Sequence, residues 1–170
     1  MSALWAAFAL LGRAVAHYPL FALAGPVLLA VGLLFNTRLK RLELGWLEWS
    51  PFGFRANLML RPVQWRWVWL PYALELAFVM PLLAFMEEWI FRAGTTNWVR
   101  GLLWGALAFG VAHLLSLVSV RMVVYMTLVG ALFVEVYMAA GLLAVFVMHA
   151  VYNLTALAAL VATRNRPLKI

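Results

Sequence analysis

The chain is organised around residues 86–92, MEEWIFR, which place two adjacent glutamates and an arginine at the end of a long apolar run. The chain has only six acidic residues, and two of them lie side by side here. An ionised carboxylate near lipid costs several kcal/mol, so an acid inside a membrane segment usually marks a functional site. Glu88 and Arg92 are four residues apart, so on a helix they share a face and can pair. Glu87 then points elsewhere and is left for chemistry.

The composition around this stretch is that of a polytopic membrane protein. Of the 170 residues, 67% are hydrophobic and 11% are charged, and the mean hydropathy is +0.97. Soluble domains average about a quarter charged residues. The sequence therefore predicts an all-α, transmembrane helical bundle. The net charge of +7 lies mostly in short segments between apolar runs, which the positive-inside bias explains better than nucleic-acid binding does.

About five spanning helices plus interfacial helices are predicted, because crossing ~30 Å of hydrocarbon takes about 20 apolar residues. The predicted spans are residues 18–35, 68–91, 98–118, 122–139 and 141–163.

Three regions are expected along the chain. Residues 1–66 are expected to form one or two N-terminal helices followed by a basic, tryptophan-rich segment that lies along the membrane surface. The first helix (3–17) is expected to be interfacial, because Arg13 and His17 interrupt its apolar run. Residues 67–163 form the helical core, and residues 164–170 form a basic tail. Positive charge recurs at 36–66, at Arg121 and in the tail, so these parts, including the C-terminus, are expected in the cytoplasm.

Several catalytic classes are excluded by missing residues. The chain has no cysteine, so a thiol nucleophile and disulfides are impossible. It has no aspartate dyad, no His-Glu-x-x-His helix and no Gly-x-Ser-x-Gly elbow.

Two of the three histidines lie inside apolar spans. His113 follows Phe109 by four residues, and His149 precedes Asn153 by four, which puts each pair on one helical face. In lipid these polar side chains cannot face the acyl chains without losing their hydrogen bonds, so they must point inward. Glu87 is the available partner.

Such a set of side chains suits the activation of water. A glutamate can act as general base while an imidazole orients the same water, and a second histidine with an asparagine can donate hydrogen bonds to an oxyanion. Alternatively, Glu87, His113 and His149 have the ligand count for a zinc ion with one open position.

At these residues the chain resembles the CAAX prenyl-protease and bacteriocin-processing proteins, also called the CPBP or Abi family of intramembrane proteases. The family pattern is Glu-Glu-x-x-x-Arg, then Phe-x-x-x-His, then His-x-x-x-Asn on successive membrane helices. The sequence supplies all three in order within about residues 70–162, as Glu87-Glu88 with Arg92, Phe109 with His113, and His149 with Asn153.

The resemblance implies an endopeptidase that cleaves near a membrane anchor or C-terminal tail of a protein or peptide substrate, in contact with membrane lipid. It implies that Glu87 activates water beside His113, that His149 and Asn153 stabilise the oxyanion, and that Glu88 and Arg92 support the helix end. A glutamate-type mechanism without cofactor is expected, since Asn153 is a poor zinc ligand; the zinc-dependent alternative stays open. A non-proteolytic relative, acting as an immunity or partner-binding protein, is the second functional alternative. The expected location is a prokaryotic inner or plasma membrane.

The connection between Glu88 and His113 is shorter than is usual in this family, and Ala93 stands before Gly94. In a straight hairpin, His113 would lie roughly 20 Å below the turn and Glu87 only about 10 Å. A kink near Pro81, or residues 94–100 dipping inward, is expected to reconcile the two depths.

Other residues receive simpler interpretations. Phe109 is predicted to pack around the site, and Gly101 and Gly105 to allow close helix contact. Glu135 is expected either to approach the site or to pair with an arginine near a helix end.

Overall fold

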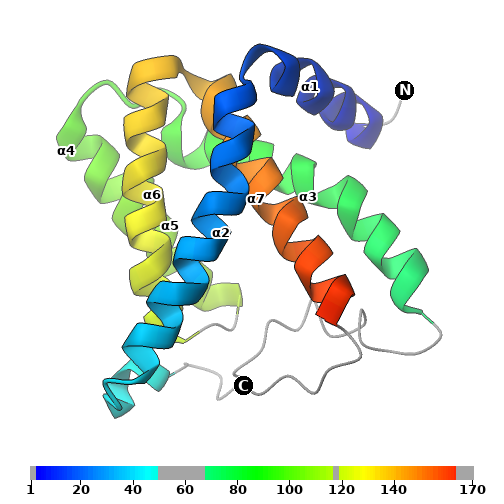
Figure 1. Cartoon of the computed structure of the whole chain (residues 1–170). Helices are drawn as coiled ribbons and strands as arrows, with labels where there is room; N and C mark the ends of the chain where they lie inside the picture. The colour runs from blue at the N-terminus through cyan, green and yellow to red at the C-terminus, as the bar shows by residue number, and fades with distance from the viewer. Residues whose placement is uncertain (1–2, 50–67, 117–118, 164–170) are drawn as a thin grey trace.

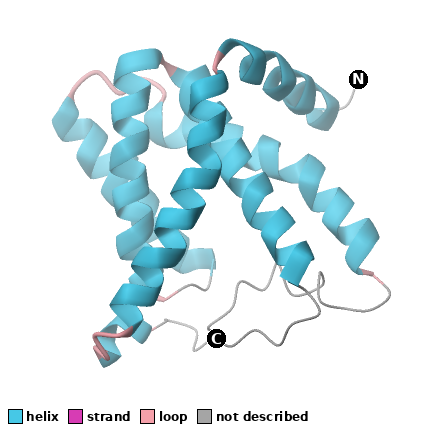
Figure 2. Ribbon diagram, in the orientation of Figure 1, coloured by secondary structure: helices cyan, strands magenta, loops and turns pink. Residues whose placement is uncertain are grey.

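The computed structural model describes residues 3–49, 68–116 and 119–163, which form a bundle of helices (Figure 1). The described residues contain no strand (Figure 2), which confirms the predicted all-α class. In chain order the elements are α1 (Ala3–His17), α2 (Pro19–Lys40), η1 (Gly45–Glu48), α3 (Trp69–Arg92), α4 (Trp98–Arg100), η3 (Gly101–Ala108), α5 (Phe109–Ala112), η4 (His113–Ser116), α6 (Val120–Ala140) and α7 (Leu142–Thr163).

Four helices of the described part are long and apolar enough to cross a membrane: α2, α3, α6 and α7. The third predicted span is a shorter apolar stretch, Trp98–Ala112, and it is irregular. Its middle, η3, is wound as a π-helix, a form that often occurs at functional sites. Most of the tryptophan-rich segment and the basic tail lie outside the described residues, so the interpretations of these parts remain predictions.

Helix α7 is the centre of the bundle and contacts α1, α2, α3 and α6. Half of its spanning part is buried inside the molecule, against 28% or less of the other three spanning helices. Gly25 permits the approach of α2, since a Cβ at this position would lie 2.7 Å from the backbone nitrogen of Tyr152. A single residue, Gly141, joins α6 to α7 at φ 83°, a conformation that favours glycine.

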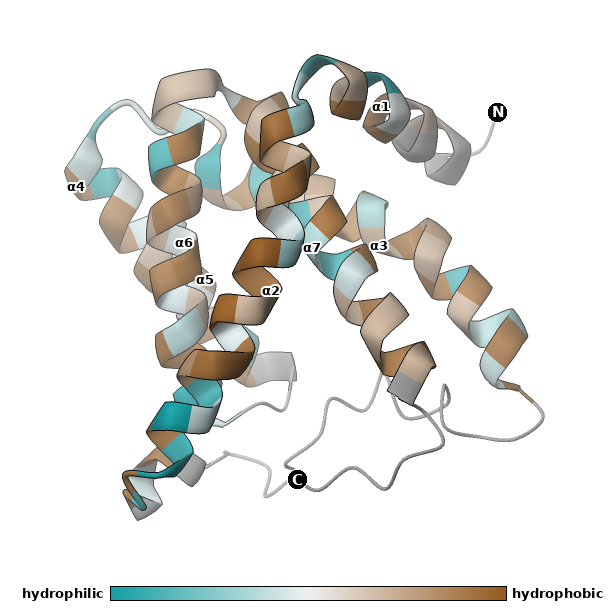
Figure 3. Ribbon diagram, in the orientation of Figure 1, coloured by the Kyte–Doolittle hydropathy of each residue, from teal (hydrophilic) through white to brown (hydrophobic). Residues whose placement is uncertain are grey.

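The helix ends gather charged residues at one side of the bundle. Arg38 and Lys40 end α2, and the backbone N–H of Val120 at the start of α6 donates to the Trp49 carbonyl at 3.0 Å. Figure 3 shows the hydrophilic residues at this lower end of α2, below a mostly apolar middle. The turns after α1 and α6 lie at the opposite end (Figure 1).

The register between α3 and the following segment decides which side chains are level. A Cβ on Gly101 would lie 3.3 Å from the Thr95 side chain, and a Cβ on Gly105 3.3 Å from the Phe91 carbonyl oxygen. The predicted packing role of the two glycines is thus confirmed. Gly101 thus faces Thr95, and Gly105, four residues later, faces Phe91, four residues earlier on α3. Continuing this antiparallel register by another four residues brings Phe109 level with Glu87.

This register bears on the expected difference in depth. Helix α3 is continuous through Pro81, and the expected kink there stays a prediction. Of the segment 94–100, which is expected to dip inward, Thr95 is buried and residues 96–100 are exposed. His113 lies only one turn beyond the level of Glu87, an axial offset of about 6 Å at 1.5 Å per residue. Side chains lean toward the N-terminus of their own helix, so in this antiparallel pair Glu87 and His113 lean toward each other.

Candidate active site

Four polar side chains meet between α3 and α7: Glu87, Glu88, Arg92 and His149. Glu88 and Arg92 are completely buried, and the side chain of His149 is 6% exposed. Charged groups with so little water need partners. Arg92 and His149 both contact Glu88, while Glu88 Oε2 and Nε and Nη2 of Arg92 form no hydrogen bond in the described part of the chain.

Glu88 is held from two sides. Arg92 Nη1 donates to Glu88 Oε1 at 3.2 Å, and Arg92 Nε lies 3.2 Å from Glu88 Oε2. The predicted pairing of these two residues is confirmed. In addition, Glu88 Oε1 lies 2.6 Å from His149 Nδ1, a contact to α7 that the sequence pattern did not indicate. Glu88 therefore links the end of α3 to the central helix.

Glu87 has a different environment from its neighbour. Its side chain is 36% exposed, and its Oε2 lies 3.6 Å from His149 Nε2. Consecutive helical residues point about 100° apart, which explains why one glutamate is buried and the other is open. The imidazole of His149 thus lies between the two carboxylates.

These contacts fix the orientation of the His149 ring. A carboxylate only accepts hydrogen bonds, so Nδ1 of His149 carries the proton that Glu88 binds. Nε2 is then the atom presented to Glu87 and to any molecule that enters beside it. A carboxylate that holds one ring nitrogen in this way sets the tautomer of the other.

His113 lies in the same region without a direct hydrogen bond to the glutamates. Its Nδ1 donates to the Phe109 carbonyl at 2.9 Å. The ring packs edge-to-face on Phe109 with 4.7 Å between centroids. Its other nitrogen, Nε2, has no hydrogen-bond partner in the described residues.

Asn153 follows His149 by one turn of α7 and is partly buried. Among the described residues its side chain forms no hydrogen bond, with His149 or with any other group. Its amide is therefore an unused donor on the same face as His149.

Two aromatic rings complete the surroundings. The guanidinium carbon of Arg92 lies 4.1 Å from the Phe109 ring centroid and 5.3 Å from that of Phe133. Phe133 is completely buried, and its centroid is 5.1 Å from that of His149. The predicted packing role of Phe109 is confirmed. Phe133 belongs to no motif, and no sequence signal distinguishes it from other apolar residues of α6.

The remaining intramembrane acids lie elsewhere. Glu75 on α3 and Glu135 on α6 are exposed. Both alternatives for Glu135 are wrong in the described structure: it does not face the buried cluster, and it forms no ion pair with an arginine there. Its neighbours Val134 and Val136 occupy the buried side of α6 instead.

A zinc site requires several donors aimed at one point. Within residues 3–49, 68–116 and 119–163, no group of three or more His or Glu side chains is arranged to hold a metal ion. Nδ1 of His149 is bound to Glu88 and Nδ1 of His113 to a backbone carbonyl, which leaves Nε2 as the available nitrogen of each ring. The expectation of a cofactor-free site and its zinc alternative both stay predictions.

An apolar cavity lies along the last turns of α3. It has a volume of about 430 Å³ and is lined by Phe85, Met86, Trp89 and Ile90, which precede and follow the acidic pair in the sequence. The stacked rings of Phe85 and Trp89 form part of its wall, with centroids 6.2 Å apart. Such a surface suits an apolar group rather than a polar one.

Comparison with known proteins gives one match. The model of a family described as type II CAAX prenyl endopeptidase, Rce1-like, matches residues 54–155. This range begins before the stretch that carries the motif resemblance and contains every residue of the buried cluster. No curated protein and no solved structure matches the chain.

Proposed function

The chain belongs to the Rce1-like family of type II CAAX prenyl endopeptidases, and on this premise we propose that it hydrolyses a peptide bond near the membrane anchor or C-terminal tail of a protein substrate, with water activated by Glu87. The observation that carries the proposal is the difference between the environments of the two adjacent glutamates. Glu88 is completely buried and contacts Arg92 and His149, whereas Glu87 is partly exposed beside His149 Nε2.

The reaction needs a base, a nucleophile and an oxyanion site. Glu87 takes a proton from water, and the resulting hydroxide forms a bond to the carbonyl carbon of the substrate. As the tetrahedral intermediate collapses, the C–N bond breaks and Glu87 returns the proton to the leaving amine. The products are a carboxylate and an amine.

His113, His149 and Asn153 position the other participants. Nε2 of His113 has no partner and leans toward Glu87, so it can accept a hydrogen bond from the same water. The free amide of Asn153 donates to the oxyanion, beside the ring that Glu88 holds in place. Each step of the proposed reaction uses only side chains of the chain itself.

The apolar cavity gives the substrate its place. Its lining of Phe85, Met86, Trp89 and Ile90 suits the apolar anchor of a substrate. Binding energy from such a remote group can be used to orient the reacting bond.

The positions of the basic residues support the proposed orientation. Arg38, Lys40, Arg41 and Arg121 lie at the end of the bundle where α2 ends and α6 begins. By the positive-inside bias we assign this end, and with it the C-terminus, to the cytoplasm.

The proposal is tested by reconstituting the full chain in liposomes with a membrane-anchored reporter peptide and measuring its fragments by mass spectrometry. We expect Glu87→Gln to lower the cleavage rate at least about 100-fold, because removing a general base typically costs 10²–10⁴. Glu75→Gln is the matched control: it makes the same change at an exposed position of the same helix and should leave the rate unchanged. Cleavage that persists in Glu87→Gln would remove the proposed base.

The same assay separates the metal-free mechanism from the zinc mechanism. We expect cleavage to survive exhaustive chelation and elemental analysis to find no stoichiometric metal. Activity that disappears on chelation and returns with added zinc would contradict the mechanism written here.

A further inference from the structure

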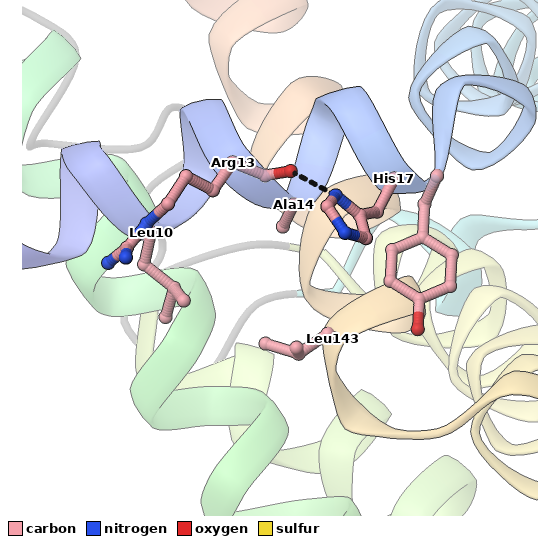
Figure 4. A pocket seen from close by; sticks show the side chains of 6 residues that line it. Leu10, Arg13, Ala14, His17 and Leu143 are labelled. Atoms are coloured by element: carbon pink, nitrogen blue, oxygen red, sulfur yellow. Dashed lines mark hydrogen bonds between the residues drawn. The ribbon is translucent and has the colours of Figure 1, made fainter.

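A second cavity lies under α1, beside the start of α7 (Figure 4). Its volume is about 350 Å³. It differs from the apolar cavity on α3 because polar and apolar side chains share its wall. The lining residues are Leu10, Arg13, Ala14, His17, Tyr18 and Leu143.

The polar part of this cavity carries positive charge and no negative charge. Arg13 and His17 lie one helical turn apart, and Figure 4 shows the Arg13 side chain on the Leu10 side of the His17 ring. Tyr18 also lines the cavity. No carboxylate lines the cavity, and neither Arg13 nor His17 has an ion-pair partner in the described part of the chain. Arg13 is exposed, so its guanidinium is available to an anion.

The ring of His17 is already oriented. Its Nδ1 donates to the Arg13 carbonyl at 3.2 Å (dashed line in Figure 4), which leaves Nε2 without a protein partner. Arg13 and the Tyr18 hydroxyl donate to an anion directly, and Nε2 of His17 does so when the ring carries two protons. These three donors line one cavity and are of the kinds that bind the oxygens of a phosphate-bearing head group.

The apolar part of the cavity narrows the choice of ligand. Leu10, Ala14 and Leu143 give a charged molecule an apolar surface to rest on. The cavity also lies at the end of the bundle that carries the α1–α2 and α6–α7 turns (Figure 1), which is the level of the lipid head groups for helices that span a membrane. A free anion would use only the polar rim, whereas a phospholipid would use both parts.

We propose that this cavity binds an anionic phospholipid, with Arg13, His17 and Tyr18 as donors to its phosphate-bearing head group and the first part of the acyl chains against Leu10 and Leu143. The inference does not depend on peptidase activity.

The site has a consequence for the position of α1. Leu11 and Ala14 of α1 pack against Ala84, Phe146 and neighbouring residues of α3 and α7. Ala84 lies three residues before Glu87, and Phe146 three residues before His149. A lipid bound under α1 would therefore hold this helix against the segments that carry the acidic pair and the histidine.

The test measures lipid binding to the purified full chain by native mass spectrometry, with dioleoyl-phosphatidylglycerol, dioleoylglycerol and inorganic phosphate as separate probes. We expect phosphatidylglycerol to bind at least about tenfold more tightly than dioleoylglycerol, which lacks the phosphate and its charge-assisted hydrogen bonds. We expect inorganic phosphate at millimolar concentration not to displace the lipid. Displacement would assign the site to a free anion, and equal binding of the two lipids would leave only apolar contact; either result overturns the proposal.

Variants connect this binding to the cavity. Arg13→Gln should weaken phosphatidylglycerol binding about tenfold, and Leu143→Trp should weaken it by filling the cavity without changing any charge. Both residues are exposed, and unfolding curves that match the wild type show that each variant is folded. Arg100→Gln is the control, because it removes an exposed arginine from α4, away from the cavity. An equal loss in Arg100→Gln, or full binding in Arg13→Gln, would contradict the site.

Discussion

Replacing Arg92 with methionine should destabilise the protein by about 3–5 kcal/mol, the cost of breaking a buried ion pair from one side. Methionine retains most of the volume and the apolar stem of arginine, so the change removes charge rather than packing. The loss includes a hydrogen bond to Glu88 at 3.2 Å, worth about 1.5–3 kcal/mol between charged groups. It also includes the contact with the Phe109 ring at 4.1 Å, worth up to about 2 kcal/mol when desolvated. Glu88 then remains buried and charged without its cation.

The free energy of unfolding can be followed in mixed micelles of dodecylmaltoside and sodium dodecyl sulfate by tryptophan fluorescence. If the uncompensated Glu88 is the main cost, Arg92→Met in a Glu88→Gln background should cost only about 1–2 kcal/mol, because a neutral amide can be buried at lower cost. Arg100→Met, at an exposed position, should stay within about 0.5 kcal/mol of the wild type. A loss below about 1 kcal/mol, or the same loss in both backgrounds, would refute the reasoning.

Two further variants test the surroundings of the site. Phe133→Leu removes the ring that packs on His149. It should lower kcat roughly 10–100-fold with little change in KM, because a small displacement of a catalytic group has effects of this size. Steady-state kinetics that show a change in KM alone would contradict this positioning role. Gly130→Ala places a Cβ 2.9 Å from Ala106 Cα and should destabilise the protein by about 1–3 kcal/mol in thermal unfolding. Gly12→Ala, where nothing lies within 4 Å, should be neutral or stabilising by up to about 1 kcal/mol, and an equal loss at both glycines would count against close packing at Gly130.

Local spacing predicted the parts of the site that depend on a single helix. The helical class follows from composition, and the Glu88–Arg92 pair follows from a separation of four residues. The same rule placed His149 and Asn153 on one face of α7. These features depend only on helix geometry, which holds wherever the helix lies in the bundle.

Features that depend on how the helices meet could not be predicted. The contact between Glu88 and His149 joins residues 61 positions apart, and it exists because α7 packs against α3 at one particular register. The depth of His113 relative to Glu87 depends on contacts of Gly101 and Gly105 with the end of α3, which no periodicity reveals. In the sequence Phe133 does not differ from the other apolar residues of α6, and its role beside Arg92 depends on how α6 packs in the bundle.

The central position of α7 has a consequence for how the protein is made in the membrane. Among the described helices, α7 is synthesised after all those it contacts, yet it supplies the middle of the bundle. Until it leaves the ribosome, Glu88 and Arg92 can pair with each other, but the imidazole that connects Glu88 to Glu87 is missing. The nascent chain therefore holds its carboxylates in an incomplete arrangement until α7 enters, and the site that we propose for water activation is assembled only when the last of these helices is in place.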